Sequence, residues 1–494
     1  MLQCFQRNDT GFSMTINKID IHELISNIKE QMAQEQLTPA LRATIEMLLS
    51  VVILLAERFG LNSKNSSTPP SADPNRRKRS RGKSERKPGG QNGHKGSTLL
   101  PVDEPDHVET FNVDRSTLPK GNYREVGYER RQVFDIDISR VVTEYRAQVL
   151  LDETGRRFVA SFPEKVTRPA QYGDGVKTHV VYMSMYQLIP YNRIEDHLGN
   201  QFGIPISQGT IFNFNLEAYE RLEEFEFWVR EMLIRAGVLH VDETGINIGS
   251  KRKWLHTASS LEYTLFFPHE KRGQEAMDEM GVLPFFQGTL CHDHWKPYYS
   301  YGLHHALCNA HHLRELERAW EQDNQQWAQK MIELLKVINK ATQEAGGALA
   351  PSEAEQYRLL YRKLLQEAEI ECPPPETPAE GKKKRGRLKR SKSRNLLERL
   401  RDFEQDVLRF MVDKNVPFSN NLAENDIRMT KVQQKISGCF RSTLGAKMFC
   451  RIRSYLSTAR KQGVSATEAL NLLFQGKLPA FVNLDAVVKA ESAE

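Results

Sequence analysis

Three acidic residues, Asp242, Asp293 and Glu424, are the strongest candidates for chemistry in this sequence. Asp242 ends the apolar run 237–242 and Asp293 ends the apolar run 288–293, so each carboxylate is expected at the tip of a buried strand. Gathered within a few ångströms, three carboxylates would repel one another and raise their pKa values unless a cation lay among them. The cluster therefore predicts a divalent metal site.

The chemical type of these ligands indicates which metal is bound and which class of substrate is used. Hard carboxylate oxygens favour Mg²⁺, or Mn²⁺, over zinc. Two such ions about 3.5–4 Å apart can clamp the attacking and leaving oxygens of a phosphodiester during in-line displacement. The acids thus indicate two metal ions and a nucleic-acid substrate.

Two of the acids also have a purely structural interpretation. The segment Asp242-Glu-Thr-Gly245 is compatible with a turn, in which Asp and Gly are common. The segment Asn421-Leu-Ala-Glu424 fits a capping box, in which the glutamate accepts a hydrogen bond from an open backbone N–H at the start of its helix. Capping and metal binding do not exclude each other.

The segments around the first two acids predict the elements that position them. Hydrophobic patterns indicate three strands, a short helix and a fourth strand, in the order 237–242, 253–260, 263–269, 274–280 and 288–293. The ribonuclease H-like fold has this order and places the acids of its first and fourth strands side by side. The predicted class is a multidomain α+β protein. It has a ribonuclease H-like α/β catalytic core with a helical insertion, preceded by helical and small β-rich DNA-binding modules.

Four motifs resemble successive signatures of one protein family. They are His240-Val-Asp-Glu-Thr-Gly245, His292-Asp-His-Trp-Lys-Pro-Tyr298, Cys308-Asn-Ala-His-His-Leu-Arg-Glu-Leu316 and Asn420-Asn-Leu-Ala-Glu-Asn-Asp-Ile-Arg428. The chain is similar here to the insertion-sequence-66 family of bacterial transposases, and the segments 62–70 and 87–96 resemble the linker of the same family. The matches follow one another in order across nearly the whole chain.

The resemblance implies a function and a set of partners. Asp242, Asp293 and Glu424 would be the catalytic DDE triad, which binds the metal ions for DNA strand cleavage and strand transfer. The implied partners are the terminal inverted repeats of the element, target DNA and small accessory proteins of the same element. The expected location is the bacterial cytoplasm, in association with the nucleoid.

The net charge of +6 understates how strongly positive charge is concentrated in two runs. Residues 76–87 carry eight Lys or Arg and one Glu, and residues 382–394 carry nine Lys or Arg and no acid. Beside a site that cuts phosphodiesters, such runs predict contacts with DNA phosphates. The predicted DNA-binding residues are Arg76, Arg77, Lys78, Arg79, Arg81, Lys83, Lys296, Arg314, Arg428, Lys431 and Lys435.

Composition and periodicity divide the chain into seven segments. They are a helical region with a candidate leucine zipper (1–60), a flexible basic linker (61–100), a small β-rich module (101–170), a helical region with a candidate helix-turn-helix (171–236), the first part of the core (237–312), a helical insertion with a basic loop (313–414), and the second part of the core with the third acid and C-terminal helices (415–494).

Two of these segments have alternative interpretations. One face between residues 41 and 59 is apolar at helical spacing, which predicts a homodimer or higher oligomer, or else a helix packed on its own domain. The residues of this apolar stripe are Leu41, Ile45, Leu48, Val52, Leu55 and Phe59. The segment 191–213, with Ser207 as the predicted N-cap of its second helix, is either a DNA-recognition unit or a helical hairpin without a DNA role.

The six cysteines are scattered, which argues against a disulfide framework and fits a cytoplasmic protein. No stretch approaches the roughly 18 apolar residues of a membrane span, and no signal peptide is recognisable at the N-terminus. The family commonly carries a zinc-binding domain in its N-terminal half, but no cysteine lies between positions 5 and 290. Cys308 and His311, with His312 beside them, have the spacing of half a zinc site, and the missing second half makes a structural role more plausible than zinc.

Two rival functions share some of these features. A ribonuclease H-like nuclease or resolvase would use the same acids without needing the zipper or the basic linker. A catalytically silent DNA-binding protein would explain the basic runs but would leave three metal-spaced acids without a role.

Overall fold

The computed structural model describes residues 15–16, 19–35, 37–60, 65–66, 99–136, 138–375 and 390–484. The chain divides into two compact units. One comprises Met1–Arg76, Phe162–Asp196 and Pro205–Glu494, and the other comprises Arg77–Ser161 and His197–Ile204. Six of the predicted DNA contacts lie outside the described residues: Arg76, Arg77, Lys78, Arg79, Arg81 and Lys83.

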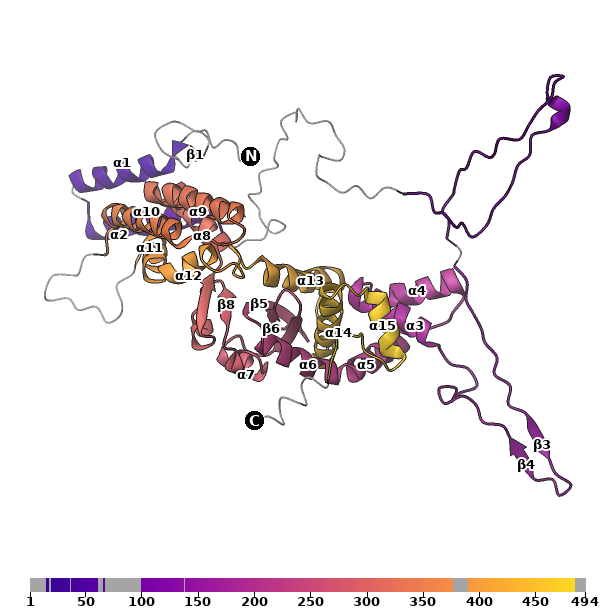
Figure 1. The fold of residues 1–494 in the computed structure, drawn as a ribbon. Coiled ribbons are helices and arrows are strands. Elements are labelled where there is room, and N and C mark those ends of the chain that lie inside the picture. The colour runs from indigo at the N-terminus through magenta and orange to yellow at the C-terminus, as the bar shows by residue number, and fades with distance from the viewer. Residues whose placement is uncertain are drawn as a thin grey trace. The chain divides into compact units, whose positions relative to one another are not determined.

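A mixed five-stranded sheet lies in the larger unit (Figure 1). Its strands are β5 (Val238–Ile248), β6 (Lys251–Ser259), β7 (Thr264–His269), β8 (Thr289–His292) and β9 (His304–Leu307). Their order is β7-β6-β5-β8-β9, with β5, β6 and β7 antiparallel and with β8 and β9 parallel to β5. The four predicted strands and the helix α7 (Gln274–Glu279) are confirmed, whereas β9 was not predicted.

Two glycine positions shape this sheet. Gly249 and Ser250 form the two-residue turn from β5 to β6, and both have positive φ angles, as a primed hairpin turn requires. At Gly288, a Cβ atom would lie 2.5 Å from the carbonyl oxygen of Gly237. A side chain there would push apart β5 and β8, the two strands that lead to the predicted catalytic aspartates.

Helices that precede β5 and helices that follow β9 in the sequence pack on the sheet. Helix α13 (Asn421–Ser437) contacts β5 and β6, and α14 (Thr443–Lys461) contacts β7, as does α6 (Glu223–Ile234). Figure 1 shows α13 beside β5 and β6. The helix α13 therefore joins the third predicted acid to the sheet that carries the first two.

Further helices precede α6 or follow α14 in the chain. They are α3 (Asp174–Val181), the π-helical turn η2 (Tyr182–Tyr186), α4 (Tyr191–Phe202), α5 (Gln208–Arg221) and α15 (Ala466–Phe474). Ser207 caps α5 as predicted, because its Oγ accepts a hydrogen bond from Thr210 N at 3.2 Å. The buried side of α5, with Ile211 and Phe214, packs against α3 and α14. A DNA-recognition role for α5 stays a prediction.

A helical insertion separates β9 from α13. It contains α8 (Asn309–Asp323), α9 (Gln326–Glu344), α10 (Pro351–Glu371), α11 (Lys392–Asp402), α12 (Glu404–Leu408) and the short turn η5 (Arg409–Met411). These helices share a hydrophobic core that includes Trp327, Leu335, Tyr361 and Leu397, and this core continues onto Leu307 of β9. The insertion is thus a packed helical body attached to one edge of the sheet.

The N-terminal helices α1 (Ile21–Gln34) and α2 (Pro39–Gly60) pack on each other. Ile25, Met32 and Leu49 form their small core, with Ile45 and Ile53 partly buried against it. Most of the predicted zipper stripe faces elsewhere: Leu48 is 60% exposed and Leu55 is 48% exposed. Two short strands, β1 (Thr15–Ile16) and β2 (Ile19–Asp20), pair before α1.

The segment 101–170, predicted as a small β-rich module, has little regular structure. It contains the 3-10 turn η1 (Arg115–Thr117) and one hairpin of β3 (Val149–Leu151) and β4 (Arg157–Val159). Of its described residues, none is buried. The described strand content is therefore a single hairpin, and these residues form no core of their own.

Of the helices in the described part of the chain, none is both long enough and apolar enough to cross a lipid bilayer.

Candidate active site

Asp242 and Asp293 lie on neighbouring parallel strands. The last paired residues of β5 and β8 are His240 and Cys291, so the same register places Asp242 opposite Asp293 two positions further along. Parallel strands run in the same direction, so both carboxylates come to one end of this strand pair. This placement agrees with the one expected from the strand order.

Helix α13 carries Glu424 and is fastened to β5 directly beside Asp242. Asn420, the N-cap of the helix, donates from Nδ2 to the carbonyl oxygen of Val241 at 2.8 Å. The Asn420 Oδ1 lies 2.9 Å from His240 Nδ1. Because Glu424 is in the first turn of the helix, these two contacts bring its carboxylate to the strand that carries Asp242.

The two structural interpretations of these acids are wrong. Residues 242–245 continue β5 rather than forming a turn. The N-cap of α13 is Asn420 rather than Asn421, and its side chain bonds to β5 instead of capping the helix. Three atoms from the start of α8 surround Glu424 Oε1: Cys308 Sγ (3.9 Å), His311 Nδ1 (3.6 Å) and Arg314 Nη2 (3.7 Å).

The electrostatics of Asp242 show that negative charge accumulates here. Its pKa is raised from 3.8 to about 8, first by burial and then by the charges of Glu243, Asp293 and Glu424. A hydrogen bond from Glu243 N to Asp242 Oδ1 (2.9 Å) acts in the opposite direction but is weaker. A divalent cation among the carboxylates would remove this repulsion, so the residues fit a hard metal ion.

Glu243 is an acid of this region that the sequence patterns did not single out. Its carboxylate accepts hydrogen bonds from Arg272 Nε (2.9 Å) and from the hydroxyl of Tyr298 (2.5 Å). The Arg272 guanidinium in turn stacks on the ring of Trp295, 4.3 Å from its centroid. Glu243 is thereby held by the segments that follow β7 and β8. Its position directly after Asp242 was the only signal in the sequence.

His312, which stands next to His311 in the sequence, faces a different environment. Its side chain is buried, and Nδ1 lies 3.0 Å from Asn309 Oδ1. Asn309 Nδ2 donates to the carbonyl oxygen of Val407 at 2.9 Å. His312 is therefore part of the interior of the insertion, whereas Cys308 and His311 lie beside Glu424.

A groove of about 920 Å³ opens next to Glu424. Its walls come from α8, α11 and the short helix η4 (Lys296–Ser300), and they include the predicted DNA contacts Lys296 and Arg314. Lys and Arg outnumber Asp and Glu among its lining residues. Basic side chains therefore predominate in the groove, and two of its lining residues, His311 and Arg314, contact Glu424.

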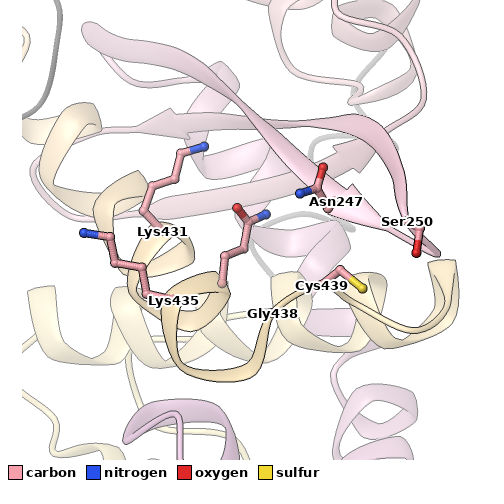
Figure 2. A pocket seen from close by; sticks show the side chains of 7 residues that line it. Asn247, Ser250, Lys431, Lys435, Gly438 and Cys439 are labelled. Atoms are coloured by element: carbon pink, nitrogen blue, oxygen red, sulfur yellow. The ribbon is translucent and has the colours of Figure 1, made fainter. Parts of the chain in front are cut away.

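A second pocket, of about 610 Å³, lies at the other end of α13 (Figure 2). Lys431 and Lys435 reach it from the helix, and Asn247 and Ser250 reach it from the β5–β6 hairpin. Lys431 Nζ donates to the carbonyl oxygen of Gly245 at 2.6 Å, and burial lowers its pKa. No acidic residue is among those that line this pocket.

The loop after α13 is attached to the same hairpin. Phe440 N donates to Asn247 O at 2.9 Å, and Gly249 N donates to Phe440 O at 2.8 Å. The pocket is therefore held between two connected backbone segments. Glu424, Arg428, Lys431 and Lys435 follow the spacing of one helix face, so a single stripe of α13 joins Glu424 to the pocket.

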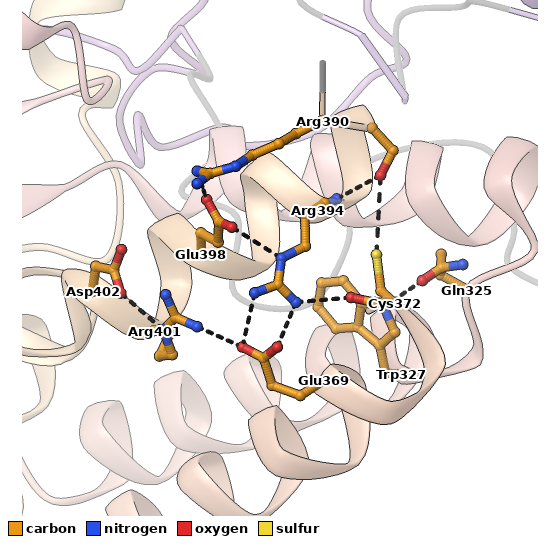
Figure 3. Close-up of polar contacts among 10 residues, drawn as sticks. Gln325, Trp327, Glu369, Cys372, Arg390, Arg394, Glu398, Arg401 and Asp402 are labelled. Carbon is orange, nitrogen blue, oxygen red and sulfur yellow. Dashed lines mark hydrogen bonds and ion pairs between the residues drawn. The ribbon is translucent and has the colours of Figure 1, made fainter. Parts of the chain in front are cut away.

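The second basic run ends in a network of ion pairs within the insertion (Figure 3). Arg394 is 5% exposed, forms ion pairs with Glu369 and Glu398, and donates to the carbonyl oxygen of Cys372 at 2.8 Å. Arg401 Nη1 reaches Glu369 Oε1 at 2.6 Å. The prediction of a DNA phosphate contact is wrong for Arg394, because α10 and α11 use its charge inside the protein.

Comparison with protein families decides the classification. The model of a family described as Transposase IS66 family matches residues 169–448, more than half of the chain. The chain belongs to the IS66 family of transposases. The matched range includes Asp242, Asp293 and Glu424, so the transposase region holds all three candidate acids.

Family membership implies DNA transposition, a ribonuclease H-like core and the use of a divalent metal. A second model, of a family of unknown function (DUF6444), matches residues 16–99 of this transposase. A comparison with curated proteins gave no significant match.

Proposed function

We propose that this transposase binds the terminal repeats of its element and catalyses DNA strand cleavage and strand transfer with Asp242, Asp293 and Glu424. One observation carries the proposal: the β5–β8 register and the Asn420 anchor of α13 bring together three acids that are distant in the sequence. The pKa of Asp242, raised by burial and then by the neighbouring carboxylates, supports the proposal. These are the properties expected of a site that holds Mg²⁺ or Mn²⁺ ions, two in the proposed mechanism.

The side chains of the site divide the work. Asp242, Asp293 and Glu424 would hold the metal, which when bound supplies Lewis-acid activation of the phosphodiester. Lys296 and Arg314, on the walls of the groove, would bind DNA phosphates and orient the scissile bond. Water attacks the phosphodiester and leaves a free 3′ hydroxyl, which then attacks target DNA. Neither step needs a covalent bond to a serine or tyrosine of the protein.

The stripe on α13 gives the bound DNA a direction. Lys435 follows Glu424 by eleven residues, which is about 16 Å along a helix axis. At ~3.4 Å per base pair, this spans roughly five base pairs of duplex. Arg428, Lys431 and Lys435 would therefore bind the backbone of the DNA that flanks the cleavage site, with the pocket of Figure 2 at the far end.

Two copies of the chain would act together through α2. Leu41, Leu48 and Leu55 are spaced by seven residues and are all more than 40% exposed, which is the pattern of a coiled-coil seam without its partner. In the dimer, Leu48→Glu would place charge in the seam and shift the protein to monomer, as measured by light scattering. Lys29→Glu, on the exposed side of α1, is the control. An unchanged mass of the Leu48→Glu variant would rule out this seam.

The decisive experiment uses labelled element ends, Mg²⁺ and the full chain. Strand-transfer products support the proposal, cuts alone indicate a nuclease or resolvase, and a shifted band alone indicates a DNA-binding protein without catalysis. Asp242→Asn should reduce cleavage at least ~10²-fold and keep DNA binding, because a ligand of the charge-stabilising metal is lost. Glu333→Gln, which changes an exposed acid on α9 of the insertion, should leave cleavage unchanged. Cleavage at the wild-type rate by Asp242→Asn would remove Asp242 from the site.

The remaining predicted contacts extend this proposal. The basic residues 76–83 are proposed to bind DNA outside the active site, and accessory proteins of the element are proposed as further partners.

A further inference from the structure

We propose that Cys308, His311 and Glu424 form a binding site for a thiophilic divalent ion such as Zn²⁺. Each residue offers one ligand atom, and the three atoms all lie within 4.8 Å of one another. In the sequence, the spacing of Cys308 and His311 provided only half of such a site. The tertiary structure supplies the third ligand from α13, more than a hundred residues further along the chain.

The separations of the ligand atoms fit a tetrahedral ion. Zinc bonds of about 2.0–2.3 Å imply ligand-to-ligand separations of about 3.3–3.6 Å in a tetrahedral site. Glu424 Oε1 lies 3.6 Å from His311 Nδ1 and 3.9 Å from Cys308 Sγ. The ligand atoms of Cys308 and His311 lie within 4.8 Å of each other, so these two side chains would need to move together by at most about an ångström to enclose the ion.

One ligand atom lacks a hydrogen-bond partner. His311 Nδ1 is buried, and among the described residues no donor or acceptor forms a hydrogen bond with it. A buried polar atom without a partner costs free energy, which a bound ion would recover. Its orientation toward Glu424 and Cys308 places this nitrogen where a metal ligand would be required.

Hydrogen bonds made by Asn420 also fix the positions of the ligands. The backbone N–H of Asn420 donates to Cys308 Sγ at 3.2 Å, and the Asn420 side chain is bonded to β5. The sulfur is thus fixed relative to the start of α13, the helix that carries Glu424. Contacts of this kind orient the side chains that bind a metal and support metal affinity.

The chemistry of the ligand set selects the ion. Thiolate and imidazole favour zinc over magnesium, whereas the Asp242 and Asp293 carboxylates favour magnesium. A thiolate and a carboxylate together balance the charge of one Zn²⁺. Arg314 Nη2 also approaches Glu424 Oε1, but at 3.7 Å it forms a weak ion pair that an ion could replace.

Glu424 is the one residue that the zinc site and the proposed catalytic site have in common. Glu424 would serve both the zinc site and the proposed magnesium site, so zinc would change how this carboxylate is shared. Binding itself does not depend on catalysis. Zinc binding without any DNA cleavage would leave this site intact and would count against the proposed function alone.

The test is a metal titration of the full-length, metal-free protein. Zn²⁺ is titrated against a chromogenic chelator, and Co²⁺ is used as a spectroscopic probe. One tight site per chain is expected, with a thiolate-to-cobalt charge-transfer band and the strong visible bands of tetrahedral cobalt. Cys308→Ser should abolish the charge-transfer band. His311→Ala should weaken zinc binding by more than the ~10–100-fold that loss of an outer-shell partner costs.

Cys439→Ser provides the matched control, because this thiol is free and lies outside the cluster. It should keep both zinc affinity and the cobalt band. A wild-type protein without the band, or a band that disappears in Cys439→Ser, would overturn the proposal even if Cys308→Ser did not fold.

Discussion

Two charged clusters in this transposase differ in how their charges are balanced. In the insertion, the buried Arg394 forms ion pairs with Glu369 and Glu398 (Figure 3). At the candidate active site, the charged groups that act on the pKa of Asp242 are other carboxylates. In the insertion, the acidic and basic side chains of the cluster pair with one another. At the candidate active site, negative charge is in excess.

The pKa shifts of Glu369 and Asp242 reflect this difference in charge balance. Burial tends to raise the pKa of Glu369, but hydrogen bonds from Arg394 and Arg401 bring it below its ordinary value. The pKa of Asp242 is raised to about 8, because burial and its neighbours act in the same direction. A fold retains uncompensated buried charge mainly where function needs it. The comparison therefore separates a cluster that stabilises the protein from one that is prepared for a ligand.

The largest expected effect is a loss of stability when the ion-pair network of the insertion is broken. Arg394→Met removes the central cation and leaves Glu369 and Glu398 without their main partner. We expect a loss of about 3 kcal/mol in the free energy of unfolding, measured in urea. Lys340→Met, which breaks the exposed pair with Glu344, should change it by no more than about 1 kcal/mol. Equal effects of the two variants would contradict the view that the insertion depends on this network.

Removing a charge from the active-site cluster should instead increase the free energy of unfolding. The folded-state pKa of Asp242, about 8, lies above the ordinary 3.8, so folding favours the protonated form. The metal-free protein should therefore be most stable below pH 4 with respect to this group, and should lose that stability as the pH rises toward 8. Asp242→Asn should remove this loss and gain at least about 1 kcal/mol at pH 8.

Thermal unfolding at several pH values measures this effect. Mg²⁺ should flatten the pH dependence of the wild type, and Glu333→Gln should leave it unchanged. If Asp242→Asn follows the wild-type curve in metal-free buffer, the cluster does not carry the excess charge described here.

The smallest expected effect concerns the basic pocket. Lys435→Ala should remove about one phosphate contact, which lowers the slope of log K against log salt by about 0.9 for duplex DNA. Lys336→Ala, on the exposed side of α9 in the insertion, should not change the slope. Fluorescence anisotropy at several salt concentrations measures both. An unchanged slope for Lys435→Ala would place the DNA away from the pocket of Figure 2.

Several features were predictable from the residues alone. The apolar runs before Asp242 and Asp293 predicted β5 and β8, and the motif order predicted the family. Charge was less informative, since a run of Lys and Arg does not reveal which members find acidic partners. The run 382–394 was assigned to DNA as a whole for this reason, although Glu369 and Glu398 hold its last residue, Arg394, inside the insertion.

Local rules also failed at Glu424. The segment Asn421–Glu424 fits a capping box, yet Asn420 is the N-cap and uses its side chain on β5. A contact across almost two hundred residues outcompeted a local hydrogen bond, and no local pattern contains that information. Glu243 and the strand β9 were missed because their partners are likewise tertiary.

By itself, the sequence determined the family and the order of the core strands and singled out the three candidate acids, because hydrophobic period and motif spacing are local properties of the chain. Only the tertiary structure decided which charges meet. It placed Glu424 between the aspartates and the pair Cys308–His311, and it enclosed Arg394 among acids. Coulomb interactions and metal coordination depend on distances in space, and those distances are set by how strands and helices pack.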